Sequence, residues 1–313
     1  RRVAVFAACS ALAAGCGAQD EPSDPLQVAA TPVAATAATS PPPTVAPSGT
    51  VLPLAGEATA VIVDPRSRTL AVGLRQPPSV VLFDLDDLER GSRSIPVPGP
   101  VEALSLPAGG PLLVSVSEPG QLLRVTLPSG TTSSLALAGR PAGSSQLGER
   151  TLVALRDRAA IGVVRDDHVE RTIAGGLFGA DQVLTVGDHA VVLDRARTAL
   201  FDVDVDAGEI KAGLRAGQGA ANAVTDRFGR VLVTDTRAGA LLAFSVNPVL
   251  LRQNFPVPGA PYGIAYDPRR DLVIVTLTER NEAVGFDVAG GEPKERFRFP
   301  TVGQPNSVAI DPD

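Results

Sequence analysis

The sequence lacks tryptophan and methionine and has only two residues each of histidine, cysteine, tyrosine and lysine. Its hydrophobic cores must therefore be built from valine, leucine, alanine and isoleucine. His168 and His189 are far apart, and neither has a second type of metal ligand at metal-site spacing. We find no nucleophile elbow and no phosphate-binding glycine loop. These absences argue against a histidine-dependent hydrolase and against a haem or zinc enzyme, so we expect neither cofactor nor metal.

The basic side chains are almost all arginine, because Lys211 and Lys294 are the only lysines among 28 basic residues. Acidic residues number 34, which gives a formal net charge of −6. A net negative charge argues against non-specific nucleic-acid binding, which depends on neutralising phosphates. We therefore expect no nucleic-acid partner.

Residues 1–15 have the pattern of an export signal, with Arg1 and Arg2 before an apolar stretch too short to span a bilayer as a stable helix. The stretch ends in Leu-Ala-Ala-Gly-Cys, which resembles a bacterial lipobox with Cys16 as the lipidated residue. The resemblance implies a lipid anchor on Cys16 and an extracytoplasmic location at the cell membrane. The alternative is a plain secretory signal with an incidental cysteine.

Residues 16–49 are rich in alanine, proline, threonine and serine and have few large apolar side chains. Such a composition cannot bury enough surface to offset the entropy of ordering. The sequence predicts a disordered tether here, followed by a folded domain at 50–313.

The folded domain repeats a unit of about 40 residues, a period typical of four-stranded β-propeller blades. The clearest copies begin with an apolar strand that ends in Asp-Pro, as in residues 261–268 and 305–312. The units run approximately over 56–99, 100–139, 140–176, 177–217, 218–259 and 260–303. The predicted fold class is therefore all-β, a β-propeller.

Two leftover segments bear on the blade count. Thr50–Leu54 has the pattern of an outer strand, and Ser307–Asp311 that of an inner strand. Together they predict a seventh blade whose two middle strands are missing, so that the closing blade is incomplete. The alternative is a six-bladed ring with 304–313 as an appendage.

The Asp-Pro turns, the second strands at 232–235 and 273–276 and the third strand at 284–287 resemble YVTN-type propeller repeats. Such repeats occur in YncE-like periplasmic proteins and in actinobacterial envelope lipoproteins. The resemblance covers 56–313 and implies the fold and an envelope location. It carries over no catalytic residue.

Propeller geometry places two sets of side chains around one mouth of the central channel. The residues just before the inner strands include Thr59, Glu102, Asp181, Tyr262 and Asn306. The turns between second and third strands contribute arginines, among them Arg75, Arg195, Arg237 and Arg280. This pattern suits a sugar, a peptide or a polyanionic polymer. Ordinary solvated turns with weak ion pairs are the alternative explanation.

We therefore expect a monomeric, membrane-anchored binding module that recognises an envelope protein, peptide or glycan, and not an enzyme. One alternative is a propeller enzyme, such as a lactonase-like hydrolase, that uses the channel mouth. The other is a structural scaffold for envelope protein complexes.

Overall fold

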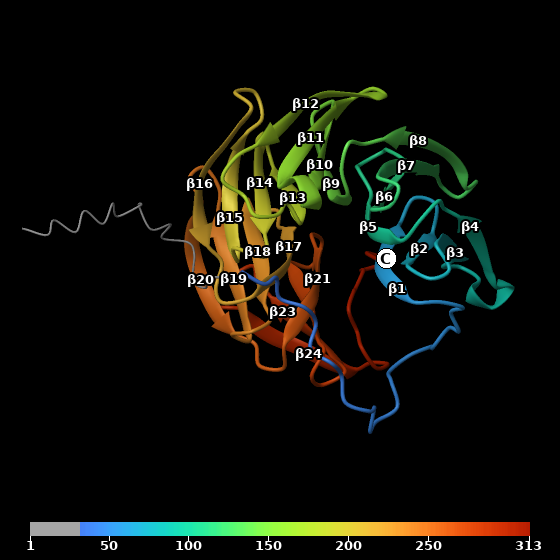
Figure 1. The fold of residues 1–313 in the computed structure, drawn as a ribbon. Coiled ribbons are helices and arrows are strands. Elements are labelled where there is room, and N and C mark those ends of the chain that lie inside the picture. The colour runs from blue at the N-terminus through green and yellow to red at the C-terminus, as the bar shows by residue number, and fades with distance from the viewer. Residues whose placement is uncertain (1–31) are drawn as a thin grey trace, which may run out of the picture.

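Residues 32–313, the part of the chain described by this computed structural model, form six four-stranded antiparallel sheets around a central axis (Figure 1). Within each sheet the strands are hydrogen-bonded in chain order. The predicted β-propeller is confirmed. In this part of the chain no helix is long and apolar enough to cross a membrane. Residues 1–15 and Cys16 lie outside the described residues.

The six sheets match the six complete repeat units of the sequence. Blades one to three contain β1 (Ala58–Asp64), β2 (Thr69–Leu74), β3 (Ser79–Asp84), β4 (Ser92–Pro96), β5 (Val101–Ser105), β6 (Leu112–Val116), β7 (Gln121–Thr126), β8 (Thr131–Ala136), β9 (Pro141–Leu147), β10 (Arg150–Leu155), β11 (Ala160–Arg165) and β12 (His168–Ala174). Blades four to six contain β13 (Gln182–Val186), β14 (His189–Asp194), β15 (Ala199–Asp204), β16 (Glu209–Arg215), β17 (Ala220–Thr225), β18 (Arg230–Asp235), β19 (Ala240–Ser245), β20 (Leu250–Pro256), β21 (Pro261–Asp267), β22 (Leu272–Leu277), β23 (Glu282–Asp287) and β24 (Lys294–Pro300). Two single-turn 3-10 helices, η1 (Leu88–Arg90) and η2 (Arg156–Arg158), follow β3 and β10.

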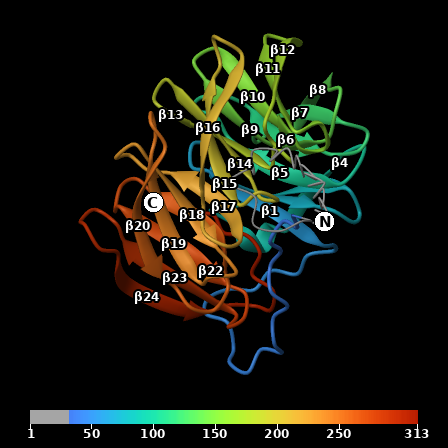
Figure 2. The same ribbon diagram turned by 60° about the vertical axis from the view of Figure 1, so that its left-hand side comes forward.

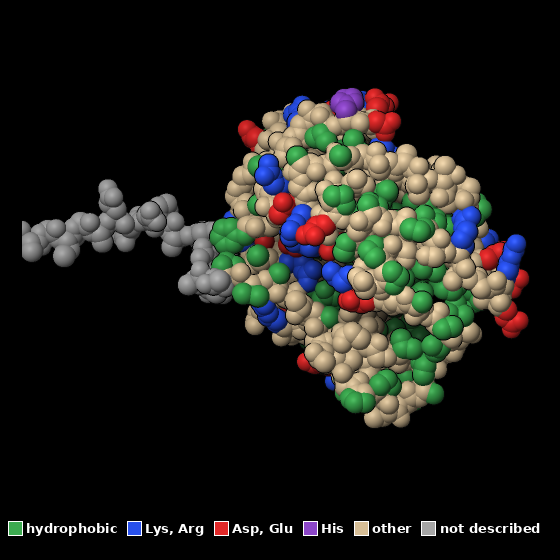
Figure 3. Space-filling view, turned by 45° about the vertical axis from the view of Figure 1, so that its right-hand side comes forward, with side chains coloured by type: hydrophobic (Ala, Val, Ile, Leu, Met, Phe, Trp, Pro, Cys, Tyr) green, Lys and Arg blue, Asp and Glu red, His purple; other side chains and the backbone are tan. Residues whose placement is uncertain are grey.

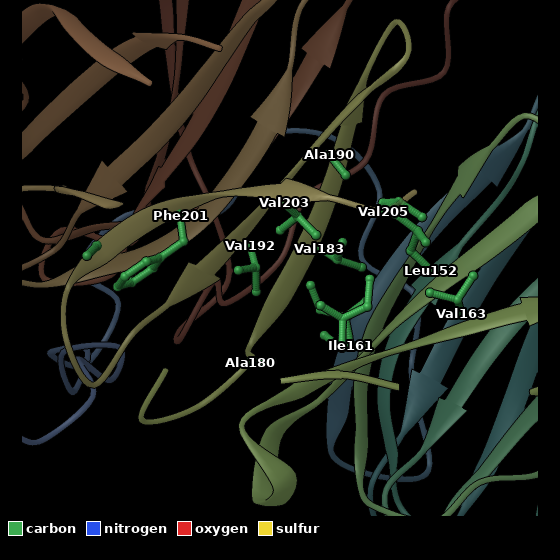
Figure 4. Packing of buried hydrophobic residues seen from close by; sticks show 13 residues of the cluster. Leu152, Ile161, Val163, Ala180, Val183, Ala190, Val192, Phe201, Val203 and Val205 are labelled. Carbon is green, nitrogen blue, oxygen red and sulfur yellow. The ribbon is translucent and has the colours of Figure 1, made fainter. Parts of the chain in front are cut away.

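The hydrophobic cores lie between neighbouring blades. Figure 4 shows one of them, where Leu152 and Ile161 of blade three face Val183 and Val192 of blade four. The second and third strands are buried on both faces, which explains their nearly continuous apolar sequences. Each fully buried leucine or valine contributes about 1.5–3 kcal/mol, so face-to-face burial compensates for the scarcity of aromatic residues.

The Asp-Pro turns at the ends of inner strands are held by the aspartate. The Asp267 carboxylate accepts hydrogen bonds from the backbone amide of Arg269 at 2.8 Å and from the side chain of Arg270 at 2.8 Å. Burial alone would raise the pKa of Asp267, but these hydrogen bonds lower it below its ordinary value. The repeated Asp-Pro motif is thus a structural device at the end of the channel opposite the mouth.

Polar contacts link the inner strands of neighbouring blades around most of the ring. The links join β1 to β5, β5 to β9, β9 to β13, β13 to β17 and β17 to β21, through Thr59–Val101, Ser105–Ser144, Ser145–Thr185, Gln182–Ala223 and Asn222–Tyr262. Within residues 32–313 no such bond joins β21 directly to β1. The ring is therefore continuous over six blades and interrupted at one place.

Residues 303–313 lie at the interruption. Arg269, in the turn after β21, donates to the carbonyl of Pro312 at 3.0 Å. Arg68, in the turn after β1, donates to the carboxylate of Asp311 at 2.8 Å. The C-terminal segment therefore bridges the first and last blades through side-chain contacts. Figure 1 shows it in red, in the sector between β1 and β24.

The predicted seventh blade is not formed as a sheet. Neither Thr50–Leu54 nor Ser307–Asp311 is a strand, so the described residues form six blades, which was the alternative count. Leu52 and Leu54 instead pack against the face of blade one that carries Val72 and Val81. A strand needs a hydrogen-bonded neighbour, and these two segments have no strand between them to supply one.

Candidate ligand site at the channel mouth

The mouth of the channel opens into a cavity of about 790 Å³ that continues along the inner strands. The structure places seven of the nine predicted mouth residues in its lining, namely Thr59, Arg75, Glu102, Asp181, Arg195, Tyr262 and Asn306. Arg156, on η2, also lines it. Arg237 and Arg280 lie on turns at the same end of the propeller but are not among the lining residues.

An ion-pair network covers the part of the mouth that belongs to blades one to four. Arg156 is at its centre, with Nε 2.8 Å from the Asp181 carboxylate and Nη1 3.2 Å from the Glu102 carboxylate. Glu102 also lies 3.8 Å from Arg75. Burial would lower the pKa of Arg156, but the two carboxylates raise it above its ordinary value. These side chains neutralise one another.

Arg195 connects this network to the uncharged part of the mouth. Its backbone amide donates to Asp181 at 2.9 Å, and its guanidinium donates to the Tyr262 hydroxyl at 3.2 Å. The guanidinium carbon also lies 5.8 Å from the centre of the Tyr262 ring, within the range of a cation–π contact. The Nε atom of Arg195 is enclosed and has no hydrogen-bond partner in the described residues. The contacts of the Arg195 guanidinium are therefore made through its terminal nitrogen, to the Tyr262 hydroxyl and the Ala35 carbonyl.

Two buried aspartates position the mouth loops, and neither is among the residues that the sequence predicts for the mouth. Asp235, at the end of β18, accepts from the backbone amides of Gln218 and Gly219, both at 2.8 Å. Asp194, at the end of β14, accepts from the amides of Phe178 and Gly179. Burial raises the pKa of Asp194 above its ordinary value. The sequence did carry a signal for these two aspartates. Each ends the second strand of its blade, and the two lie one blade period apart in the chain.

Thr59 and Asn306 are engaged in local structure. The Thr59 hydroxyl donates to the carbonyls of Gly73 and Val101, so it helps to join blades one and two. Asn306 accepts from the Gln304 side chain at 2.9 Å. With Asn222 and Tyr262, Asn306 makes this part of the lining polar and uncharged.

The N-terminal segment crosses the mouth, and this differs from the expected tether. Ala35 is buried with 1% of its surface exposed, and its carbonyl accepts a hydrogen bond from Arg195. The carbonyl of Val33 accepts from Arg237 at 2.8 Å. Hydrogen bonds to backbone carbonyls thus hold this segment. The prediction of a disordered tether considered only the burial of side chains, so it did not include these hydrogen bonds. Residues 16–31 of the expected tether lie outside the described residues.

The same segment continues over blade six. Gln304 donates to the Ala38 carbonyl at 2.9 Å, and Asn281 donates to the Pro41 carbonyl at 2.8 Å. Farther on, the Ser48 amide donates to the Pro300 carbonyl at 2.9 Å. In both ribbon views this blue segment runs along the sheet that ends in β24 before it enters β1 (Figures 1 and 2).

The arrangement favours some ligand chemistries over others. Three arginines and three carboxylates line the cavity (Arg75, Arg156, Arg195, Glu57, Glu102 and Asp181), so its formal charge balances. Basic and acidic side chains are also interspersed on the face shown in Figure 3, without a continuous patch of either sign. Within residues 32–313 no three His, Cys, Asp or Glu side chains are grouped so that they could hold a metal ion. A balanced, polar mouth suits a neutral or zwitterionic ligand better than a polyanion.

Comparison with known proteins identifies the fold. No family model and no curated protein matches the sequence. Among solved structures, the chain is similar to a streptogramin B lyase, with a TM-score of 0.69 and 9% identity over 82% of this chain and 87% of that one. It is also similar to Kuenenia stuttgartiensis hydrazine synthase, with a TM-score of 0.68 and 17% identity over 85% and 93%. A catalytically inactive virginiamycin B lyase from Staphylococcus aureus, solved with quinupristin, gives a TM-score of 0.66 and 13% identity over 78% and 84%. At these identities the similarity shows the propeller fold alone.

Proposed function

We propose that this protein is a binding module whose ligand site is the channel mouth, and that it acts outside the cytoplasm, anchored to the membrane through lipid on Cys16. The observation that carries the proposal is the charge-balanced cavity of about 790 Å³, with the enclosed Arg195 beside Tyr262. A cavity of this size with a few convergent polar groups is typical of small-ligand and peptide sites.

The location is carried by the lipobox-like residues 12–16. Attached acyl chains would hold the protein at the membrane, because each buried methylene contributes about 0.8 kcal/mol. A processed Cys16→Ala protein that still partitions into detergent as before would contradict this part of the proposal.

The ligand class is a neutral or zwitterionic peptide or glycan. Of the arginines in the lining, Arg75 and Arg156 already pair with carboxylates, so a polyanion would have to displace those partners. The site is proposed as a binding site and not as a catalytic one. The names of the similar lyases describe those proteins alone.

Saturation-transfer NMR on the full chain tests the site, because it detects binding in the millimolar range. The probes are neutral oligosaccharides, capped alanine-threonine peptides and polyphosphate. We expect transfer to one of the neutral classes, weak dependence on salt, and loss of most of the signal in Tyr262→Ala, whose ring and hydroxyl both contact Arg195.

Phe228→Ala is the matched control. Phe228 is also a partly exposed aromatic residue, but it lies on the turn between β17 and β18, at the other end of the channel. Equal loss of the saturation-transfer signal in the two variants would contradict ligand binding at the mouth. So would the absence of transfer to any probe. Polyphosphate could instead bind with an affinity that falls steeply with salt and falls again in Arg237→Ala or Arg280→Ala. That result would favour a site formed by the arginines of the turns between second and third strands.

A further inference from the structure

The N-terminal segment contacts the mouth in the manner of a bound peptide. Its contacts come from the turns between second and third strands of blades four, five and six, namely Arg195, Arg237 and Asn281. Gln304 supplies the remaining side-chain donor. These residues belong to elements 160 or more positions away in the chain, so the contacts are tertiary.

The side chains of the site bind the backbone of the segment. Val33 and Ala35 offer their carbonyls to Arg237 and Arg195, and in an extended chain the carbonyls of residues two apart point to the same side. The side-chain amide of Gln304 donates to the Ala38 carbonyl. Its oxygen accepts from the backbone amide of Ser40 at 3.0 Å. Gln304 thus bonds residues two apart, as a residue of a neighbouring parallel strand would.

Two side chains of the segment also contact the site. The Ser40 hydroxyl donates to the Thr278 carbonyl at 2.6 Å and accepts from the Gln304 backbone amide at 3.0 Å. Ala35 is enclosed in the cavity, whereas the neighbouring Val33 is 63% exposed. Ala35 is therefore the enclosed residue of the segment, and its small side chain lies against the site. Pro41, Pro42 and Pro43 follow and hold the next part of the segment extended at low entropic cost.

We propose that the mouth is a recognition site for extended peptides rich in alanine, threonine and proline, and that residues 33–41 are its intramolecular occupant. This inference rests on the proposed function and names both its ligand class and its regulation. A ligand in trans must displace the segment, whose attachment gives it a millimolar effective concentration. The segment therefore sets a threshold for binding.

The test uses a fluorescein-labelled, capped peptide with the sequence of residues 32–43 and the full chain. Ala35→Lys should release the segment, because it places an ammonium group at an enclosed position beside the Arg195 guanidinium, which repels its charge. Val33→Lys is the matched control, since it adds the same side chain to the same segment at a position that points to solvent. By fluorescence anisotropy we expect Ala35→Lys to bind the peptide at least about tenfold more tightly than the wild type or Val33→Lys do.

A second variant combines Arg195→Ala with Ala35→Lys. We expect it to lose the gain in peptide affinity that Ala35→Lys alone produces. Equal peptide affinity in the wild type and Ala35→Lys, with loss in Arg195→Ala, would overturn intramolecular occupancy and leave the mouth as the ligand site. No peptide binding to any variant, while neutral oligosaccharides still give Tyr262-dependent transfer, would overturn the peptide class. Absence of both signals would overturn the proposed function as well.

Discussion

Gly285 in β23 and Phe297 in β24 form a cross-strand pair in which the phenylalanine ring covers the glycine. A Cβ atom at Gly285 would lie 2.2 Å from the ring, well inside van der Waals contact. Phe201 and Gly213 make the same kind of pair in blade four, with a Cβ at Gly213 2.5 Å from the ring. A glycine opposite a phenylalanine thus lets the aromatic ring lie flat on the sheet.

We predict that Gly285→Ala destabilises the protein. The new methyl group must displace the Phe297 ring, which is stacked on Phe299 with centroids 5.0 Å apart. Overpacking of this kind costs about 1–3 kcal/mol. Thermal unfolding followed by circular dichroism should therefore show a midpoint lower by several degrees than that of the wild type.

Gly290→Ala is the control for that experiment. No atom lies within 4 Å of the position that its Cβ would occupy, and its backbone is outside the left-handed region. Its unfolding midpoint should match the wild type. If the two alanine variants unfold at the same temperature, the covering of Gly285 by Phe297 does not stabilise the sheet.

Single residues of the site were predictable where the repeat fixes their position. Alignment of the units placed Glu102, Asp181 and Tyr262 at the mouth, and all three line the cavity. Ala35 and Gln304 were not predictable, because their contacts depend on backbone carbonyls and on tertiary approach. A segment of alanine, threonine and proline carries no side-chain signal for such contacts.

The strand β9 forms although its sequence is only weakly apolar, because neighbouring strands provide hydrogen-bond partners for its polar side chains. Ser144–Leu147 reads as a poor inner strand, yet β9 extends over Pro141–Leu147. Ser144 and Ser145 satisfy their hydroxyls through Ser105 of β5 at 2.7 Å and Thr185 of β13 at 2.8 Å. The hydroxyl groups that make this segment less apolar than the other inner strands are the groups that join three blades.

The aspartates of residues 202–206 behave as strand alternation predicts. Phe201, Val203 and Val205 are buried, whereas Asp204 pairs with Lys211 at 2.6 Å. The side-chain hydrogen bond from Lys211 lowers the pKa of Asp204 below its ordinary value. Alternation is readable from sequence, because it depends only on the two-residue period of a strand.

For the complete ring, the sequence predicted the six complete blades but not the contacts that bridge the first and the last of them. The repeat period is a local property, so it located each sheet within a few residues. Bridging depends on contacts between distant segments, such as Arg68 with Asp311, and no local pattern encodes them. Residues 32–57 add a second connection, since they run from the turn of blade five across the mouth and blade six to β1.

If the mouth is a peptide site occupied by its own N-terminal segment, that segment should be protected from proteolysis. The most direct measurement is the rate at which elastase, which cuts after small residues, cleaves the full chain within residues 32–46. We predict slow cleavage in the wild type and in Val33→Lys, and cleavage at least about tenfold faster in Ala35→Lys, because a docked segment must detach before it fits a protease. Equal rates in all three proteins would show that the segment does not occupy the mouth.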